Sequence, residues 1–427
     1  MKVLIIGSGG REDALAWKIS QSPLLTKLYI APGNGGTASK GTNVALEVND
    51  IPQIISFCQK EKIDLVVVGP ELPLVLGIQD ALDKEHIPCF GPNSFAAQLE
   101  GSKSFAKEIM LKTGVPTAKF QIFTDYEQAL SFVQTQNFPL VIKADGLAAG
   151  KGVVIAKNPA QAKKALIDFM QNKIFGQAGE KVLIEEALVG EEVSFLAFCD
   201  GQNVTYLPSS QDHKRIGEHD TGPNTGGMGA YSPAPILADK DLEYIGNIVI
   251  KPIINELQKQ GHPFVGILYA GLMLTSEGPK VLEYNVRFGD PECQPLMLRL
   301  KTDLLEIIQA CLTQKLNHIQ MEIDPKSALC VVIAAKGYPQ KYPKGMEISG
   351  LDKVKNLSDV IIFHAGTKQE NGKYYTNGGR VLNVTALGKN LIEAKKKAYE
   401  AAKRISFPNM YYRKDIGDKG IAKLEKN

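Results

Sequence analysis

The sequence predicts an α/β fold that begins with a doubly wound parallel sheet. The prediction rests on near-continuous apolar runs, which occupy residues 2–7, 27–31, 64–69 and 88–91. Helical patterns lie between these runs, including 11–19 and 74–85. Strands of a parallel sheet are buried on both faces, so they read as continuous apolar runs separated by helices. The length of 427 residues is typical of about three domains, and this sheet would form the first.

Glycine-rich or acidic turns follow the apolar runs, at GSGGRE (7–12), APGNGG (31–36), GPELPL (69–74) and GPNS (91–94). Ligands of doubly wound sheets bind beyond the carboxyl ends of the strands, so these turns are candidate binding segments. Backbone amides at the start of a helix after GSGGRE would bind a phosphate. We interpret this turn as the site of a phosphorylated substrate, with a structural tight turn as the alternative.

The same turn does not fit a dinucleotide-binding protein. Its third glycine position holds Glu12, and the second apolar run ends without the acid that would bind a ribose hydroxyl. An NAD-dependent dehydrogenase is therefore disfavoured.

The middle of the chain predicts a second group of helices and strands. A helix over 102–113 has Ser102 as its N-cap, with Gly114 and Pro116 ending it. Further helices are predicted over 126–134, 160–170, 239–260 and 303–313, and strands over 120–123, 140–144, 152–156, 182–188, 194–200, 204–208, 266–274 and 281–288. Residues 209–235 show no periodicity, and a loop of this length in a compact domain is usually functional or disordered.

A third unit is predicted from about Lys326 onward. Its elements are strands over 328–337, 360–367 and 379–388 and a helix over 390–405. The helix is basic, and we interpret its charged residues as a solvated face.

Composition narrows the class of protein. The net charge of +3 is too small to indicate a nucleic acid or an anionic membrane as partner. No apolar run reaches the roughly eighteen residues of a membrane span. The first apolar run stops at Gly7, which indicates a core strand of a cytoplasmic protein rather than a signal peptide. The six cysteines are dispersed without a CxxC pair, so we expect reduced, buried thiols rather than disulfides or a zinc site.

The segment KADGLAAGKGVVIA (143–156) indicates a phosphate-covering flap. It places Lys143 at the end of one strand, then a glycine-rich turn with Lys151, then a second strand. A Walker loop would need Ser or Thr after the lysine and then a helix, and neither is present. A hairpin can close its backbone amides over a triphosphate and exclude water. The alternative is a flexible hairpin with surface lysines.

The segment IEEALVGEEVS (184–194) is a candidate nucleotide edge. The carbonyl of Glu186 and the amide of Leu188 could bind an adenine, and Glu192 could bind ribose hydroxyls. An acidic linker is as often only solvated surface, and the neighbouring motifs favour the binding interpretation.

The segment EYNVRFGDPE (283–292) predicts a metal and anion site. Alternation with period two assigns Val281, Glu283, Asn285 and Arg287 to one face, and Leu282, Tyr284, Val286 and Phe288 to a core face. Carboxylate and amide oxygens suit Mg²⁺, and an arginine fork suits a carboxylate or phosphate. An exposed amphipathic strand is the alternative, which Asp290 and Glu292 make less favourable.

The segments SQDHKR (210–215) and TGPNTGGMGA (221–230) lie in the aperiodic stretch. Asp212 could hold an ammonium, and Lys214 and Arg215 could hold anions. His213 is more typical of a surface or capping histidine than of a catalyst. The second segment is rich enough in glycine to surround a very small ligand with backbone groups.

These motifs together resemble the glycinamide ribonucleotide synthetase family, also called phosphoribosylamine–glycine ligases. RFGDPE followed by Gln294 matches the family signature, and GSGGRE, GPE, KADGLAAGKGV, SQDHKR and TGPNTGGMGAYSP stand in the family order over essentially the whole chain. The resemblance implies an ATP-grasp fold in three parts. These are an N-terminal substrate-binding domain (1–101), an ATP-grasp domain (102–325) with a flexible lid (about 120–190), and a small α+β C-terminal domain (326–427).

The resemblance also implies an activity. The family uses ATP to join glycine to 5-phosphoribosylamine through glycyl phosphate, which yields glycinamide ribonucleotide, ADP and phosphate in de novo purine biosynthesis. It implies Mg²⁺ or Mn²⁺ as cofactor and a cytoplasmic protein, which we expect to be a monomer. The alternatives are another ATP-grasp carboxylate–amine ligase acting on a different small acid, and a nucleotide-binding regulator without catalysis.

The resemblance assigns roles to residues of this sequence. Catalytic roles fall to Arg287, Asp212 and Lys143. ATP is expected at Lys103, Lys143, Gly146, Gly150, Lys151, Gly152, Glu185, Glu186, Leu188 and Glu192. The other substrates are expected at Gly9, Gly10, Glu12, Asn93, Ser94, Asp212, Lys214, Arg215, Arg287, Asp290, Pro291 and Glu292, and the metal at Glu283 and Asn285.

Overall fold

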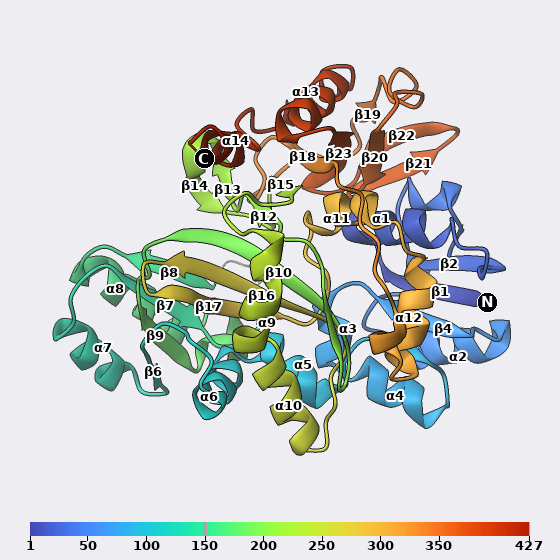
Figure 1. The fold of residues 1–427 in the computed structure, drawn as a ribbon. Helices are drawn as coiled ribbons and strands as arrows, with labels where there is room; N and C mark the ends of the chain where they lie inside the picture. Colours follow the sequence, from blue (N-terminus) through green and yellow to red (C-terminus); the bar gives the residue numbers. More distant parts are fainter. Residues whose placement is uncertain (148–151, 427) are drawn as a thin grey trace.

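A computed structural model describes residues 1–147 and 152–426. Its first part is a five-stranded parallel sheet in the order β3-β2-β1-β4-β5, which confirms the doubly wound prediction. The strands are β1 (Lys2–Gly7), β2 (Lys27–Pro32), β3 (Thr42–Asn43), β4 (Leu65–Val68) and β5 (Cys89–Phe90). The helices of this part are α1 (Gly10–Ile19), α2 (Ile51–Glu61), α3 (Glu71–Val75), α4 (Ile78–Lys84) and α5 (Ser94–Gly101). Strands β1, β2 and β4 and helices α1, α2 and α4 lie on the right of Figure 1.

Local backbone geometry explains where this part differs from the prediction. The single helix expected over 74–85 is two helices, α3 and α4, because Gly77 adopts a left-handed conformation (φ +87°) between them. Strand β3 and helix α5 were not predicted, since β3 has only two residues and α5 has a weak apolar pattern.

Helix α6 (Lys103–Thr113) leads into a separate antiparallel sheet in the order β6-β9-β7-β8. Its strands are β6 (Phe120–Phe123), β7 (Leu140–Ala144), β8 (Val153–Ala156) and β9 (Val182–Glu186). Helices α7 (Tyr126–Gln134) and α8 (Pro159–Leu166) pack on it. This unit has its own apolar core, which includes Phe123, Ile142 and Leu166. It lies on the left of Figure 1, opposite the N-terminal sheet.

The central sheet is antiparallel in the order β11-β10-β16-β17. Its strands are β10 (Glu191–Asp200), β11 (Val204–Tyr206), β16 (Val265–Thr275) and β17 (Gly278–Asn285). The helix expected over 239–260 is broken into α9 (Leu242–Val249) and α10 (Lys251–Lys259), because Pro252 cannot donate the hydrogen bond that would continue the first helix. Helix α12 (Leu304–Leu312) was predicted, and α11 (Cys293–Arg299) was not.

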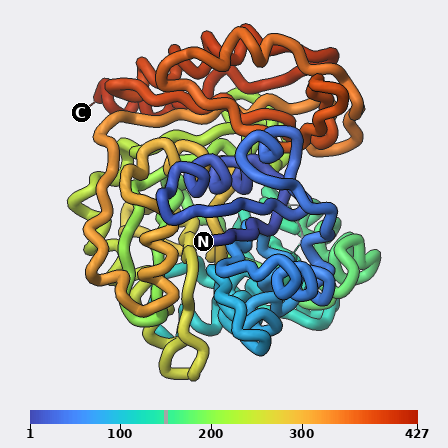
Figure 2. The backbone as a smooth tube through the Cα atoms, turned by 90° about the vertical axis from the view of Figure 1, so that its right-hand side faces the viewer, coloured from blue at the N-terminus to red at the C-terminus, as the bar shows by residue number. Residues whose placement is uncertain are grey.

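The C-terminal sheet has the order β12-β15-β18-β23-β20, with β24 (Met410–Tyr411) also paired to β18. Its strands are β12 (Gln211–Asp212), β15 (Gly229–Ser232), β18 (Ser327–Ala335), β20 (Val360–His364) and β23 (Arg380–Gly388), with helix α13 (Leu391–Ala402) packed against β18 and β23. Smaller elements are β13 (Arg215–Gly217), β14 (Thr221–Asn224), β19 (Glu347–Ile348), β21 (Thr367–Glu370), β22 (Lys373–Thr376) and α14 (Asp418–Leu424). Figure 2 shows this part lying across the top of the molecule.

The prediction that residues 209–235 form a loop without regular structure is wrong. Strands β12 and β15 form there because β15 pairs antiparallel with β18, about a hundred residues further along the chain. A four-residue strand carries too little periodicity to be recognised without its partner. The domain boundaries stay a prediction.

Two predictions from composition can be compared with the structure. All six cysteines are free and buried, as expected. Within residues 1–147 and 152–426, no helix has the length and apolar character needed to cross a membrane.

A buried asparagine joins the first and last parts of the chain. The Nδ2 atom of Asn34 donates to the carbonyls of Ser8 and His364, at 2.9 Å each. Its Oδ1 atom accepts from the amides of Gly36 (2.8 Å) and Thr37 (3.1 Å). One side chain therefore fixes the turn after β2, the turn after β1 and the end of β20.

We predict that Asn34→Ala lowers the free energy of unfolding by about 2–4 kcal/mol, because it leaves buried backbone groups without partners. Urea denaturation of the purified variant measures this change. Asn377→Ala is the matched control, since Asn377 is exposed and takes part only through its backbone amide. Equal stability of the two variants would show that Asn34 does not hold the two parts together.

Candidate functional site

A β-bulge in β17 sets the polar face of the central sheet. Glu283 lies opposite Gly271, whereas Val281 lies opposite Leu272, so the register shifts by one residue at Leu282. Val281 is consequently buried on the core face with Tyr284. The assignment of Val281 to the polar face is therefore wrong, while Glu283 and Asn285 do share one face.

Glu283 is a carboxylate surrounded by cations. Its side chain is 41% exposed, and Oε1 lies 4.0 Å from Nζ of Lys214. Burial alone would raise the pKa of Glu283, but Lys214, Lys143 and Lys103 hold it below the ordinary value. An ionised, accessible carboxylate next to cations from separate elements can bind a metal that also carries phosphates.

Lys103 and Asp145 join the start of α6 to the turn after β7. Nζ of Lys103 donates to the carbonyl of Gly146 at 2.8 Å, and burial lowers the pKa of Lys103. The carboxylate of Asp145 accepts from the amide of Ser104 at 3.0 Å and from its hydroxyl at 2.6 Å. Gly146 has φ +104°, a conformation that glycine adopts at little cost.

The phosphate-covering flap is only partly within the described residues. Gly150 and Lys151 lie outside them. Gly152 is buried, and its carbonyl accepts from the amide of Ala144 at 2.8 Å, which continues the β7–β8 pairing.

Two lysines share one buried carboxylate, that of Glu185. Nζ of Lys143 lies 2.9 Å from Oε2 of Glu185 and donates to the carbonyl of Leu282 at 3.1 Å. Nζ of Lys107, on α6, lies 3.2 Å from Oε1 of Glu185. Lys107 was not a predicted site residue. The available signal was its position four residues after Lys103, which puts both lysines on one helix face.

The strand connector after β9 is held by its backbone. Glu186 accepts from the amide of Lys119 through Oε1 at 2.9 Å, and its own amide donates to the Lys119 carbonyl. Leu188 is half-buried. Glu192, expected to bind ribose, is an exposed side chain that pairs with Lys214 at 3.0 Å.

The structure brings Asp212 and Lys214 into the same cluster. Burial raises the pKa of Asp212 to about 8, and the carboxylates of Glu292, Glu192 and Glu283 act in the same direction, against Lys214. Burial opposes the charge of Lys214, yet the carboxylates of Glu192, Asp212 and Glu283 raise its pKa well above the ordinary value. The Asp212 carboxyl is thus poised to ionise when a further cation enters.

The side chains of His213 and Arg215, the sequence neighbours of Asp212 and Lys214, form no hydrogen bond or ion pair with this cluster among the described residues. His213 is buried rather than at the surface, and neither ring nitrogen has a hydrogen-bond partner among the described residues. Burial lowers its pKa to about 4, so it is neutral at physiological pH. Arg215 donates to the carbonyl of Gly222 at 2.7 Å and so holds the β13–β14 hairpin.

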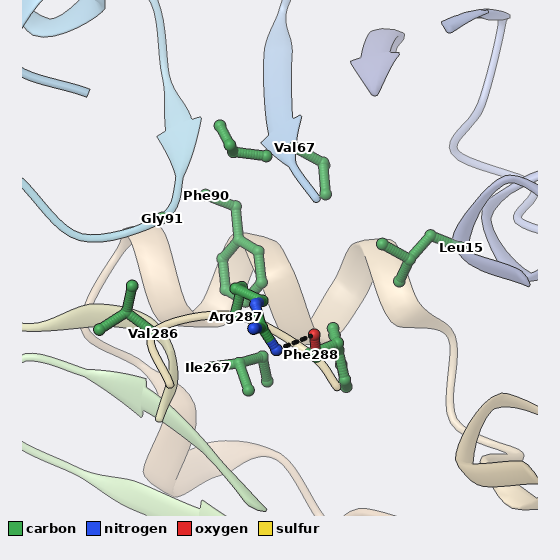
Figure 3. A pocket seen from close by; sticks show the side chains of 9 residues that line it. Leu15, Val67, Phe90, Gly91, Ile267, Val286, Arg287 and Phe288 are labelled. Atoms are coloured by element: carbon green, nitrogen blue, oxygen red, sulfur yellow. Dashed lines mark hydrogen bonds between the residues drawn. The ribbon is translucent and has the colours of Figure 1, made fainter. Parts of the chain in front are cut away.

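Arg287 links the end of the central sheet to the N-terminal part. Its Nε lies 3.1 Å from Oε2 of Glu71, on α3, and its Nη2 lies 2.6 Å from Oε1 of Glu100, on α5. Nη2 also donates to Oδ1 of Asn285 at 3.2 Å. Figure 3 shows Arg287 beside a small cavity with apolar walls, lined by Leu15, Val67, Val68, Phe90, Gly91, Ile267, Val286 and Phe288.

The two carboxylates that share Arg287 have divergent pKa values. Burial would raise the pKa of Glu71, but Arg287 and Arg11 lower it to about 2. Burial raises the pKa of Glu100 to about 7, despite the attraction of Arg287 and because Glu71 is already charged nearby. Arg287 therefore helps to keep Glu71 fully ionised, whereas burial leaves Glu100 close to its titration point despite the same guanidinium.

The GDPE turn is the meeting point of all three parts. Oδ2 of Asp290 lies 3.1 Å from Nη2 of Arg380, on β23, and accepts from the amide of Arg11 at 3.4 Å. Pro291 lies against Gly227, where an added Cβ would be 2.4 Å from its Cδ. Glu292 is buried and accepts from the hydroxyls of Tyr269 (2.7 Å) and Ser194 (3.2 Å).

The predicted phosphoribosylamine residues have partners within the chain. The amide of Gly9 donates to Oε2 of Glu12 at 2.6 Å, which caps α1. Glu12 also lies against Gly69, where an added Cβ would be 2.0 Å from Oε1. Gly10 lies against Asn383 and Gln294. Asn93 caps α5 through the amide of Ala96, and Ser94 donates its amide to Asp80. Their binding roles stay predictions.

The three parts of the chain match three domains of one known synthetase. Residues 101–293 match the phosphoribosylglycinamide synthetase ATP-grasp (A) domain, and residues 1–100 and 328–419 match the N and C domains of the same synthetase. The structure is also similar to a biotin carboxylase domain from Hydrogenobacter thermophilus (TM-score 0.74, 14% identity, 99% and 98% of the two chains), a likeness that concerns the fold alone. The fold and the domain match define an ATP-grasp protein.

The relatives define the family. The chain is 49% identical to phosphoribosylamine–glycine ligase of Vibrio vulnificus over 99% of both chains. It is also 51% identical to the trifunctional purine biosynthetic protein adenosine-3 of Gallus gallus. That match covers 100% of this chain and 43% of the trifunctional protein. A crystal structure of phosphoribosylamine–glycine ligase from Thermotoga maritima matches with a TM-score of 0.82 at 34% identity, covering 97% of this chain and 100% of that one. The chain belongs to the phosphoribosylglycinamide synthetase family, as its motifs predicted.

The raised pKa of Glu100 predicts a pH-dependent term in stability. Its folded value of about 7 exceeds the ordinary 4.5, so its stabilising contribution is present below pH 4.5 and is lost as the pH rises through about 7. Glu100→Gln is neutral at every pH. We therefore expect the free energy of unfolding of the wild type, relative to this variant, to fall between pH 4.5 and 7 in urea titrations.

Asp64→Asn is the matched control, because Asp64 only caps the exposed start of β1 through the amide of Lys2. A constant difference between the wild type and Glu100→Gln over this pH range would show that Glu100 stays ionised in the folded protein.

Proposed function

We propose that this chain uses ATP to ligate glycine to 5-phosphoribosylamine, yielding glycinamide ribonucleotide, ADP and phosphate in purine biosynthesis. Relatives at about half identity over the full length carry the name of this ligase. The observation that carries the proposal in this chain is the ionised, accessible Glu283, with Lys103, Lys143 and Lys214 around it. Such a cluster suits a phosphoryl transfer, which needs positioning and charge neutralisation.

Glu283 and Asn285 fit a divalent cation that also binds phosphates. No cluster of three or more His, Cys, Asp or Glu residues suited to a metal occurs in the described part of the chain. Mg²⁺ held together with substrate phosphates needs only one or two protein ligands, so this pair is sufficient. When bound, Mg²⁺ or Mn²⁺ would neutralise negative charge that develops on the phosphates.

Lys103 and Lys143 would bind phosphate oxygens. Both lysines help to hold the pKa of Glu283 below its ordinary value. Lys103 donates to the carbonyl of Gly146, and Lys143 pairs with Glu185. The turn 145–152 would cover the phosphates. The connector after β9, with the Glu186 carbonyl and the Leu188 amide, would bind the adenine, and Glu192 would bind the ribose.

The chemistry proceeds in two transfers. A glycine carboxylate oxygen forms a bond to the γ-phosphorus, and the bond from that phosphorus to the β–γ bridging oxygen breaks, releasing ADP. The amine of phosphoribosylamine then attacks the carbonyl carbon, the C–O bond to phosphate breaks, and the amine loses a proton. Neither transfer needs a covalent enzyme nucleophile, so the chain's task is alignment and charge stabilisation.

Glycine would bind between Asp212 and Arg287. An entering ammonium group favours the ionised form of Asp212, whose pKa in the free protein is about 8. Arg287 would bind the carboxylate and then the acyl phosphate, in exchange for part of its pairing with Glu71 and Glu100. Lys214 and Arg215 would assist in binding anionic groups.

Phosphoribosylamine would bind where the GDPE turn meets α1. Gly9, Gly10, Glu12, Asn93, Ser94, Asp290, Pro291 and Glu292 form this proposed subsite. The amide of Arg11, at the positive end of α1, would bind the phosphate in place of its 3.4 Å contact with Asp290.

An ADP-release assay tests the proposed function. The wild type receives ATP, Mg²⁺, glycine and phosphoribosylamine generated in situ, and glycine is omitted in the control. We expect ADP release to require glycine and to yield glycinamide ribonucleotide. A panel with other small acids tests the alternative ligase, which would show a higher kcat/KM for one of them. ADP release independent of any acid would contradict both.

We further propose that the enzyme acts as a cytoplasmic monomer without a nucleic-acid or membrane partner. The small net charge of +3 argues against a nucleic-acid or membrane partner. The buried free cysteines suit a reducing compartment such as the cytoplasm. Light scattering after size exclusion measures the mass, which should be that of one 46.5 kDa chain.

We predict that Glu283→Ala lowers kcat at saturating Mg²⁺ by roughly a hundredfold or more, because the phosphates lose their metal-binding carboxylate. Glu277→Ala is the matched control, since Glu277 is a 74% exposed residue of the β16–β17 hairpin whose one ion pair among the described residues is with Lys280. Steady-state ADP release measures both. Near wild-type turnover of Glu283→Ala would exclude the metal role.

We predict that Arg287→Lys lowers kcat/KM for glycine by about a hundredfold, because a point charge cannot replace the planar fork. Arg404→Lys, at an exposed position, serves as the control. Thermal unfolding of both variants separates misfolding from a lost contact. An unchanged kcat/KM for glycine in a folded Arg287→Lys variant would place the glycine carboxylate elsewhere.

A further inference from the structure

We propose that Lys107 is a positioning residue that acts through Glu185 to keep the ammonium group of Lys143 available to the nucleotide phosphates. The inference rests on the proposed function, which places the phosphates at Lys143. The carboxylate of Glu185 lies between the two lysines, 2.9 Å from Nζ of Lys143 and 3.2 Å from Nζ of Lys107. We call these three residues the Lys-Glu-Lys triad.

The net charge of the triad depends on Lys107. A buried Lys143–Glu185 pair alone would carry no net charge, and an anion approaching Lys143 would also meet the negative charge of Glu185. Lys107 supplies a second positive charge on the far side of that carboxylate. The triad as a whole is therefore singly positive, and Lys143 retains a net attraction for phosphate.

The side chain of Lys107 is buried behind Glu185. Its side chain is only 2% exposed, so it does not reach a ligand itself. Its Nζ also donates to Oγ1 of Thr117 and lies 5.4 Å from the centre of the Phe120 ring, which hold it in place behind Glu185. Oε1 of Glu185 accepts no hydrogen bond among the described residues, so its contact with Lys107 is an ion pair at 3.2 Å.

A buried lysine is costly, which argues against a purely structural role. Burial lowers the pKa of Lys107 to about 8, against the attraction of Glu185, and Lys143 acts in the same direction as burial. An apolar residue of similar length would avoid this cost, since buried ion pairs seldom add net stability over well-packed apolar side chains. A charged residue at this position is therefore better explained by what its charge does at Lys143.

The first experiment compares adenine ligands that differ in the number of phosphate groups and therefore in negative charge. Calorimetric titrations with adenosine, ADP and a non-hydrolysable ATP analogue, each with Mg²⁺, are run on wild type, Lys107→Met and Lys107→Arg. We expect Lys107→Met to weaken the ATP analogue roughly tenfold and ADP less, and to leave adenosine unchanged. Lys107→Arg keeps the charge and should restore most of the affinity. Lys112→Met is the control, since Lys112 lies on the same helix but pairs with Glu256 at the surface.

The second experiment restores the charge balance in another way. Lys107→Met combined with Glu185→Gln returns the triad to a single positive charge. If Lys107 acts through charge, the double variant binds the ATP analogue more tightly than Lys107→Met alone. If Lys107 only fills space, the second substitution gives no gain or a further loss, which overturns the proposal.

The pH profile gives a readout that does not depend on the Met variant folding. Glu185, Glu186 and Lys143 are the charged groups that act on Lys107. Loss of the Lys107 proton neutralises the triad, so kcat/KM for ATP should fall as the pH rises through about 8. Arginine does not titrate there, so Lys107→Arg should remove this contribution while that of Asp212 remains. Identical profiles for wild type and Lys107→Arg would show that this contribution near pH 8 does not come from Lys107.

These measurements separate the two proposals. Binding of the ATP analogue is measured without glycine, so it reports on the triad even if the wild type fails the glycine-dependent assay. Suppose the wild type ligates glycine and a folded Lys107→Met variant binds adenosine, ADP and the ATP analogue as tightly as the wild type does. The role of Lys107 is then rejected, and the proposed function stands.

Discussion

The structure depends on how charge is balanced around Glu283. Burial works against an ionised carboxylate at this position, and lysines from three separate elements overcome that cost. Lys103 comes from the start of α6, Lys143 from the end of β7 and Lys214 from the segment after β12. The lysines hold the pKa of Glu283 below its ordinary value only while these elements are packed together, so the properties of the site depend on that packing.

Hydrogen bonds and ion pairs across the parts meet this requirement. Arg287 ties the end of β17 to α3 and α5, and Asp290 ties the following turn to α1 and to Arg380 on β23. Asn34 joins the N-terminal turns to the end of β20. Most of these groups are buried or nearly so, where a lost partner costs more than a surface contact would. The proposed glycine and phosphoribosylamine subsites lie along these contacts between the parts of the chain.

Much of the candidate site could be predicted because its signals are local. A glycine-rich turn between two strands, an acid after a strand and a polar face with period two are visible within a few residues of Lys143, Glu186 and Glu283. The signals failed where pairing partners were distant. The bulge at Leu282 depends on the register with β16, and it moved Val281 to the core. The role of Lys107 depends on Glu185, which lies on another element.

The sequence by itself determined the α/β class, the family and the residues around which the proposed chemistry is arranged, because each of these is written in short-range spacing and residue type. Only the tertiary structure decided which charges meet. A lysine's partner, a carboxylate's pKa and the strands formed within 209–235 depend on contacts between residues far apart in the chain. Coulomb energy and desolvation depend on distance and burial in space, and no spacing along the sequence measures either.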